Sequence, residues 1–313
     1  MKRIILSARL KRRVILFSIF IALFLPHLAY GQVEINENKA LVVDGELFFP
    51  FGFWAVQKDE LQEVAEAGCN TVLTTFSLPR SQEYYTADGM IDYMNEAEKQ
   101  GLKIMLWWEM FALDLPGDIV TPNIINTEWV VQYSYHRDYH AIQDPEKYGQ
   151  YAHRTDEYMD ALLEHHLQAF KQGILKIKDH RALLGYSGMD EPSSTIKDRP
   201  ACKRIYDTAH LYDPNHPLWL MFSSRIKWVD NNDCDMLGID KYWKPDQGET
   251  PLVVANAIDA AIARANEVNK PFIFVPQYSN WSGSPQELTP SEQRCQLYVA
   301  VIHGGKRNFN LEL

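Results

Sequence analysis

Several motifs that identify common enzymes and binding proteins are missing from this 313-residue chain. Its four cysteines, Cys69, Cys202, Cys234 and Cys295, include no CxxC pair, so we expect no zinc or other metal site. The chain has no HExxH motif, no GxSxG elbow and no glycine-rich phosphate loop after its first predicted strand. These absences argue against serine hydrolysis and a nucleotide-binding sheet, and nothing in the sequence calls for a cofactor.

Acidic residues are absent from the first 31 positions. Six Lys and Arg residues lie between positions 2 and 13, an apolar run covers 14–25, and Ala29-Tyr30-Gly31 leads to a cleavage point near Gly31 and Gln32. The apolar run is short for a membrane span. We therefore predict a signal peptide at 1–31, a single mature domain at 32–313, and a secreted or periplasmic protein. The alternative is an uncleaved N-terminal anchor.

Basic residues are scarce in the mature domain. The whole chain has 31 Lys and Arg against 41 Asp and Glu, and removing the six basic leader residues leaves 25 against 41, a net charge of −16. Such an acidic surface disfavours nucleic acid and anionic membranes as partners and suits a soluble protein that handles neutral ligands. Once the leader is removed, we expect no stable membrane association. In an oxidising compartment, Cys202 and Cys234 could form a disulfide.

Strand and helix patterns alternate along the mature domain. A hairpin over 42–49 with Asp44-Gly45 as its turn runs on towards Trp54. Predicted strands begin at Leu47, Cys69, Leu102, Leu183, Leu218, Met236, Pro271 and Arg307; predicted helices cover 59–67, 88–100, 155–178, 201–211, 252–268 and 291–302. Eight strands, mostly separated by helices, predict parallel strands and an α/β fold, a (β/α)8 TIM barrel, with no helix after the eighth strand. An open doubly wound sheet is the alternative.

Carboxylates, amides and aromatic rings follow the predicted strands. The apolar run from Leu183 ends in Asp190-Glu191-Pro192, and Pro192 favours an extended Glu191 that points into a cleft. In a parallel barrel the C-terminal strand ends share one face, where the chemistry takes place. Alongside Asp240, this face would carry Trp54, Trp107, Trp108, Glu109, Tyr242, Trp243, Gln277, Tyr278 and Trp281. Rings suit the flat apolar faces of sugars, while acids and amides suit their hydroxyls, so this set predicts a carbohydrate cleft. The competing interpretation is a solvated turn and barrel-rim packing.

Over about residues 40–310 the chain resembles the clan A glycoside hydrolases, which include cellulase-like and β-galactosidase-like (β/α)8 enzymes. The resemblance rests on the entry hairpin, 43–52, on the strand-two and strand-three segments, 68–72 and 101–105, and on Asp190-Glu191-Pro192. In such enzymes the acid/base glutamate ends strand four, commonly after Asn. The resemblance therefore implies that Glu191 is the acid/base and that Asp190 takes the Asn position, where its charge favours a protonated Glu191.

One position departs from the pattern. The nucleophile of these enzymes is a Glu at the end of strand seven, where this chain has Gln277, and an amide cannot serve. Three interpretations stay open: an inverting hydrolase with Glu191 as acid and Asp240 or Glu109 as base, substrate-assisted retention by Glu191 with Asp190, or an inactive carbohydrate-binding barrel. We predict a glycoside hydrolase that cleaves O-glycosidic bonds of a poly- or oligosaccharide, with Glu191, Asp190 and Asp240 as catalytic residues; the inactive barrel is the alternative.

Overall fold

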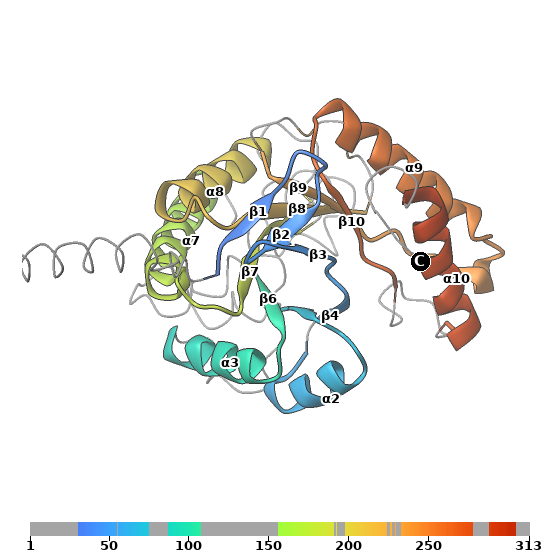
Figure 1. Cartoon of the computed structure of the whole chain (residues 1–313). Helices are drawn as coiled ribbons and strands as arrows, with labels where there is room; N and C mark the ends of the chain where they lie inside the picture. The colour runs from blue at the N-terminus through green and yellow to red at the C-terminus, as the bar shows by residue number, and fades with distance from the viewer. Residues whose placement is uncertain are drawn as a thin grey trace, which may run out of the picture.

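A curled sheet of parallel strands, covered by helices on its outer side, forms the body of the protein in the computed structural model (Figure 1). The structure describes residues 31–54, 56–74, 87–107, 156–190, 192, 198–223, 226, 229, 233–277 and 288–304. The sheet contains β4 (Gly52–Trp54), β5 (Thr71–Leu73), β6 (Lys103–Trp107), β7 (Leu183–Asp190), β8 (Leu218–Phe222), β9 (Met236–Ile239) and β10 (Phe272–Phe274). These are seven of the eight predicted barrel strands, and the eighth, 307–313, lies outside the described residues.

Strand order follows chain order from one edge of the sheet to the other. The sequence of neighbours is β4, β5, β6, β7, β8, β9, β10, and every pair is parallel. Parallel neighbours in chain order result from repeated right-handed βα units, because each crossover helix returns the chain to the same end of the sheet. The fold is therefore a mixed α/β half-barrel of the (β/α)8 type, and the alternative of an open doubly wound sheet is wrong.

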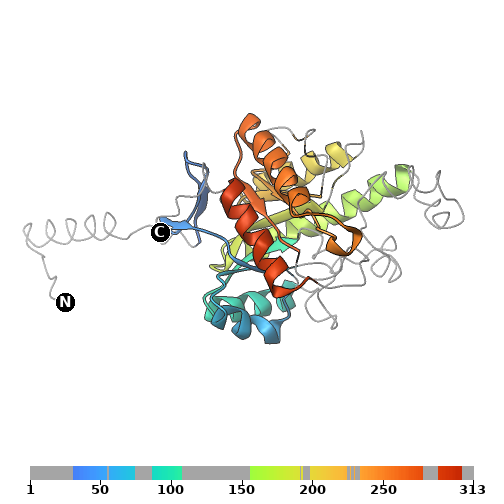
Figure 2. The same ribbon diagram turned by 90° about the vertical axis from the view of Figure 1, so that its right-hand side faces the viewer.

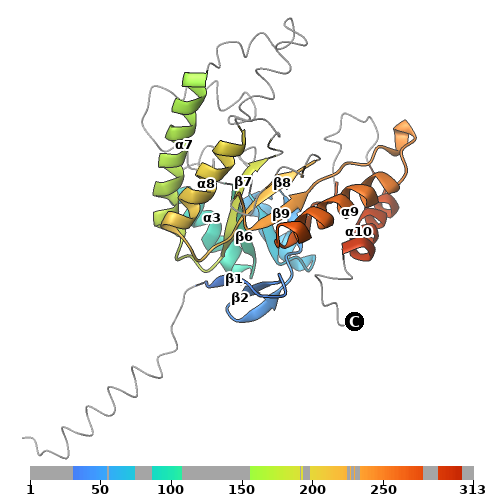
Figure 3. The same ribbon diagram turned by 90° about the horizontal axis from the view of Figure 1, so that it is seen from above.

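The helices between the strands agree with the sequence pattern. They are α2 (Leu61–Glu66), preceded by the short helix η1 (Lys58–Glu60), α3 (Ala87–Lys99), α7 (Asp156–Ile177), α8 (Asp198–Tyr212), α9 (Leu252–Glu267) and α10 (Pro290–Gly304). In the view of Figure 3, α7 and α8 lie to the left of the sheet and α9 and α10 to its right. In α9 the residues that face the sheet recur at helical spacing: Val254, Ala255, Ile258, Ala261 and Ala265.

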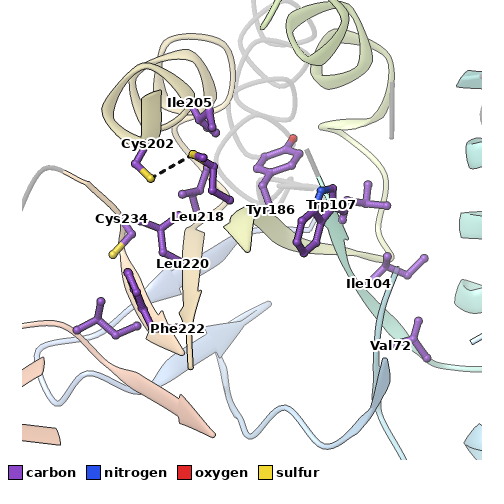
Figure 4. Close-up of a cluster of buried hydrophobic side chains, with 14 of the residues drawn as sticks. Val72, Ile104, Trp107, Tyr186, Cys202, Ile205, Leu218, Leu220, Phe222 and Cys234 are labelled. Atoms are coloured by element: carbon purple, nitrogen blue, oxygen red, sulfur yellow. Dashed lines mark hydrogen bonds between the residues drawn. The ribbon is translucent and has the colours of Figure 1, made fainter. Parts of the chain in front are cut away.

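The main core lies between the sheet and these helices. Strand residues such as Val72, Ile104, Leu220 and Phe222 share one buried cluster with helix residues such as Ile205 (Figure 4). Such continuous apolar strands are typical of parallel sheets that are buried on both faces. In the described helices, no segment combines the length and apolarity that a membrane crossing requires.

All four cysteines are free thiols, so the disulfide considered for Cys202 and Cys234 is absent. Both side chains are fully buried in the main core (Figure 4). Cys202 Sγ donates instead to Met189 Sδ at 3.5 Å, and burial raises the pKa of the Cys234 thiol far above its ordinary value. Both thiols therefore behave as small core residues.

A separate three-stranded sheet covers the end of the barrel where the strands begin. It consists of β1 (Val33–Ile35), β2 (Leu41–Val43) and β3 (Glu46–Phe48), all antiparallel (Figure 2). Its turn has φ of 53° at Asp44 and 86° at Gly45, as a two-residue hairpin of the predicted kind requires. Its apolar side chains join a second core inside the barrel, formed by Val33, Leu41, Val43, Leu73, Met105, Leu184, Trp219, Met221 and Met236.

Two details of this region differ from the prediction. The strand expected from Leu47 to Trp54 is two strands, β3 and β4, which belong to different sheets. Pro50 lies between them and cannot donate to a ladder, so the chain leaves one sheet there and enters the other. The sequence analysis also missed β1, because a three-residue strand carries too little alternation to be recognised.

Candidate active site

The C-terminal ends of the barrel strands bring several predicted site residues to one face. Trp54, Trp107 and Asp190 end β4, β6 and β7, Asp240 follows β9, and Gln277 follows β10. Tyr242 and Trp243 lie in the loop after β9. Glu191, Trp108, Glu109, Tyr278 and Trp281 lie outside the described residues, as does the side chain of Asp190, so their roles stay predictions.

At the ends of β4 and β6, two tryptophan rings lie next to each other. The ring centroids of Trp54 and Trp107 are 6.1 Å apart and their planes are inclined by 33°. Trp107 is only 5% exposed, whereas Trp54 is half-buried. Next to them Thr74 is buried after β5, and its backbone N–H donates to the Met105 carbonyl at 3.0 Å. Trp54 is therefore the member of the pair that can present its ring to a ligand.

On the β9 and β10 side, Gln277 organises the loop that follows β9. Its Oε1 accepts a hydrogen bond from the backbone N–H of Trp243 at 3.0 Å. Its own backbone N–H donates to Oε1 of Gln296 in α10 at 3.4 Å. The indole Nε1–H of Trp243 donates to the Glu249 carbonyl at 2.9 Å, and the Lys244 N–H donates to Glu249 Oε2 at 2.9 Å. This chain of bonds ties the loop to β10 and α10.

Burial shows what these groups can do. Gln277 is 5% exposed, and its side-chain oxygen accepts a hydrogen bond from the Trp243 N–H, so this amide is held in one position. Trp243 is 7% exposed, so most of its surface packs against the protein. The sequence analysis places both among the substrate-binding residues, and that role stays a prediction.

Asp240 is the acidic group at this face whose side chain is described. It follows β9 directly, and its backbone N–H donates to the Phe222 carbonyl at 3.1 Å, which continues the ladder with β8. Its side chain is only 2% exposed. A buried carboxylate at the C-terminal strand ends of a parallel barrel is typical of catalytic groups in this fold.

Gln296 and Glu249 were missed by the sequence analysis. Gln296 is fully buried on α10, where a polar residue within the packed face of a helix could have drawn attention. Glu249 lies in a loop after Gly248 and carried no pattern. Within the described part of the chain, no group of three or more His, Cys, Asp or Glu residues is arranged to hold a metal ion.

Comparisons with known proteins agree with this architecture. No protein-family model matches the sequence, and no curated protein matches it. Solved β-glucuronidase structures do: that from Dictyoglomus thermophilum is 14% identical with a TM-score of 0.57, covering 89% of this chain and 45% of its own. For Ruminococcus gnavus β-glucuronidase the identity is 16%, the TM-score 0.57 and the coverage 89% and 44%. For an uncultured Clostridium sp. β-glucuronidase these values are 14%, 0.54, 89% and 45%.

These likenesses show that the chain has a glycoside-hydrolase-like (β/α)8 fold. The chain spans less than half the length of these neighbours, since it covers 45% of the D. thermophilum chain and 44% of the R. gnavus chain. The expected fold is therefore confirmed. Activity and substrate are separate questions, because one fold hosts many functions.

Proposed function

We propose that the protein is a secreted glycoside hydrolase in which Glu191 donates a proton to the leaving oxygen and Asp240 is the second carboxylate. The observation that carries the proposal is the buried Asp240 at the C-terminal end of β9, on the face where β7 runs into Asp190 and Glu191. The neighbouring strand end at β10 offers the amide of Gln277 instead of a third acid. Secretion rests on the basic and apolar leader.

Gln277 at the position of the strand-seven nucleophile favours an inverting mechanism, because an amide cannot attack the anomeric carbon. β7 and β9 are separated by one strand, β8, so Asp190 at the end of β7 and Asp240 after β9 lie at the same end of the sheet. Inverting glycosidases hold their carboxyl groups about 6.5–9.5 Å apart, and retaining ones about 5–5.5 Å apart. In the inverting reaction, Asp240 takes a proton from a water that attacks the anomeric carbon while Glu191 protonates the departing oxygen.

The experiment is hydrolysis of polysaccharides and aryl glycosides, with aryl β-glucuronides included because the structural neighbours are β-glucuronidases. Glu191→Gln and Asp240→Asn should each lower turnover by about 10²–10⁴-fold, the usual contribution of a general acid or base. Asp246→Asn is the matched control, because this acid lies exposed in the same loop region and should leave turnover unchanged.

Product configuration, read by NMR during the first turnovers, tests the mechanism separately. An inverted product is expected. A retained product would exclude Asp240 as the base that activates water, and full activity of Glu191→Gln would exclude Glu191 as the general acid. Absence of turnover of every substrate by the unmodified protein would exclude the hydrolase proposal itself.

A second function is favoured by one observation. Gln277 follows β10, the seventh strand of the barrel sheet, where it is buried and its oxygen accepts a hydrogen bond from Trp243. An uncharged amide in place of the nucleophile is what a catalytically inactive carbohydrate-binding barrel would have. In that case calorimetry would detect glycan binding, and no substrate on the panel would be turned over. The tilted pair of Trp54 and Trp107 would then serve binding alone.

A further inference from the structure

A buried polar network lies at the end of the barrel opposite the candidate active site. The hydroxyl of Tyr186 donates to Asp213 Oδ2 at 2.7 Å, and His216 Nδ1 lies 2.8 Å from the same oxygen. The backbone N–H of Asn215 donates to Asp213 Oδ1 at 3.2 Å. All three side chains in the network are almost completely buried. Asp213 therefore has its acceptor positions filled from several sides.

The other ring nitrogen of His216 has no such partner. His216 is 2% exposed, and its Nε2 makes no hydrogen bond within the described part of the chain. The tautomer of His216 that donates from Nδ1 to Asp213 presents a lone pair at Nε2. A buried acceptor left unpaired is unfavourable, so a donor is expected at this nitrogen.

The space in front of Nε2 lies against the backbone of Gly31. A Cβ added to Gly31 would lie 3.9 Å from His216 Nε2 and 3.5 Å from the His180 carbonyl oxygen. Gly31 is buried and has φ of +57°, which favours glycine. Gln32 is held in place because its carbonyl accepts the Asp44 N–H at 3.0 Å. Two acceptors thus lie beside Gly31, the residue that precedes Gln32 in the chain.

Leader removal would create a suitable donor at this point. The small-residue approach Ala29-Tyr30-Gly31 predicts hydrolysis of the Gly31–Gln32 bond, in which water leaves a carboxylate on Gly31 and an ammonium group on Gln32. An ammonium group has three N–H donors, and its hydrogen bonds are strengthened by its charge. The ionised Asp213 behind His216 supplies the opposite charge.

We propose that the α-ammonium group of Gln32, released when the leader is removed, binds to Nε2 of His216 and the carbonyl oxygen of His180. This site locks the mature N-terminus, and with it the three-stranded sheet, to the barrel. Before cleavage the same position is an uncharged peptide bond, so the precursor is less stable than the mature protein. Leader removal thus stabilises the fold through one buried histidine, independently of any reaction at the C-terminal ends of the barrel strands.

The test compares the secreted protein with a variant in which one glycine is inserted between Gly31 and Gln32. The insertion keeps the cleavage motif and moves the amine by about one residue, or 3.8 Å. Intact mass should show cleavage before Gln32 in the first protein. Its folding equilibrium constant in urea should exceed that of the variant by about tenfold, with a melting temperature about 2–4 °C higher.

His216→Leu in both proteins separates the amine contact from general loss of stability. The difference between the two N-termini should disappear in the His216→Leu pair, and the amine of the secreted protein should react more slowly with an acylating ester than in urea. Equal stability of the two N-termini, a difference that persists without His216, or a mature chain that begins elsewhere would each overturn the proposal.

Discussion

Buried polar residues of this protein are held by hydrogen bonds to a charged group, as the contacts of Asp213 show. Its burial disfavours the charged carboxylate, but the hydrogen bonds from His216, Tyr186 and the Asn215 N–H outweigh burial and bring the pKa of Asp213 below its ordinary value. Burial, followed by the charge of Asp213, raises the pKa of the Tyr186 hydroxyl well above its usual value. Tyr186 therefore remains a donor well above the pH at which an exposed tyrosine ionises.

Removing this donor gives a residue-scale prediction. Tyr186→Phe should lower the free energy of unfolding by about 1.5–3 kcal/mol at pH 7, the usual range for a hydrogen bond to a charged group. Tyr93→Phe is the matched control, because its buried hydroxyl donates to the neutral Val56 carbonyl at 3.0 Å and should cost about 0.5–1.5 kcal/mol. Urea denaturation of both variants measures the two values.

The same pair has different pH dependences. A carboxyl whose pKa is lowered by folding contributes stability above its unfolded pKa, about 3.9, and loses that contribution as pH falls through its folded pKa. The effect of Tyr186→Phe should therefore shrink below about pH 4, while that of Tyr93→Phe stays constant. A Tyr186→Phe effect that persists unchanged in acid would show that Asp213 is already neutral in the folded protein.

At the scale of the elements, β7 contains two glycines that allow a close approach to its neighbour β8. A Cβ on Gly185 would lie 2.4 Å from the Pro217 carbonyl oxygen, whereas a Cβ on Gly188 would meet Leu220 Cδ2 at 2.7 Å. A backbone atom cannot move without shifting the start of β8, but a leucine methyl can rotate away. Gly185→Ala should thus destabilise the protein by about 3 kcal/mol or more and Gly188→Ala by about 1 kcal/mol. Denaturation midpoints measure this, and equal effects would show that β7 and β8 adjust freely.

Element prediction from the sequence worked where the pattern was long. The period of α9 and the apolar run from Leu183 identified their elements to within one or two residues. The division between β3 and β4 was missed because both segments are apolar, and only packing assigns them to different sheets. A Cβ on Gly52 would lie 1.5 Å from the Thr71 carbonyl oxygen, so β4 is placed by its contact with β5. No local propensity reports such a contact.

At the scale of the whole molecule, the order of the strands predicted which residues would lie at one end of the sheet, but not which hydrogen bonds each side chain would make. Asp240 was singled out from its place after an apolar run, and the structure holds it buried on the expected face. Gln277 was singled out by resemblance, yet its bond to Trp243 joins two loops that are far apart in the sequence. Because such bonds depend on which strand ends lie side by side, residue spacing alone could not reveal them.

The small sheet that covers the strand starts also contributes to the inner core of the barrel. Leu41 in β2 is 5% exposed and packs with Trp219, Met221 and Met236 inside the barrel, while Leu47 in β3 is 68% exposed. Lys103 Nζ, at the start of β6, lies 3.6 Å from Asp44 Oδ2 in the hairpin turn and donates to the Arg181 carbonyl at 2.7 Å. The small sheet therefore closes the inner core of the barrel from one end.

Leu41→Ala should cost about 2–5 kcal/mol, since it opens a cavity in that core, and Leu47→Ala should cost less than about 0.5 kcal/mol. If the small sheet and the barrel share one core, unfolding of Leu41→Ala followed by tryptophan fluorescence and by circular dichroism should give coincident transitions. Trp219 reports on the inner core directly, because it belongs to the same buried cluster as Leu41. Two separated transitions would mean that the small sheet detaches first and that the barrel keeps its curvature without it.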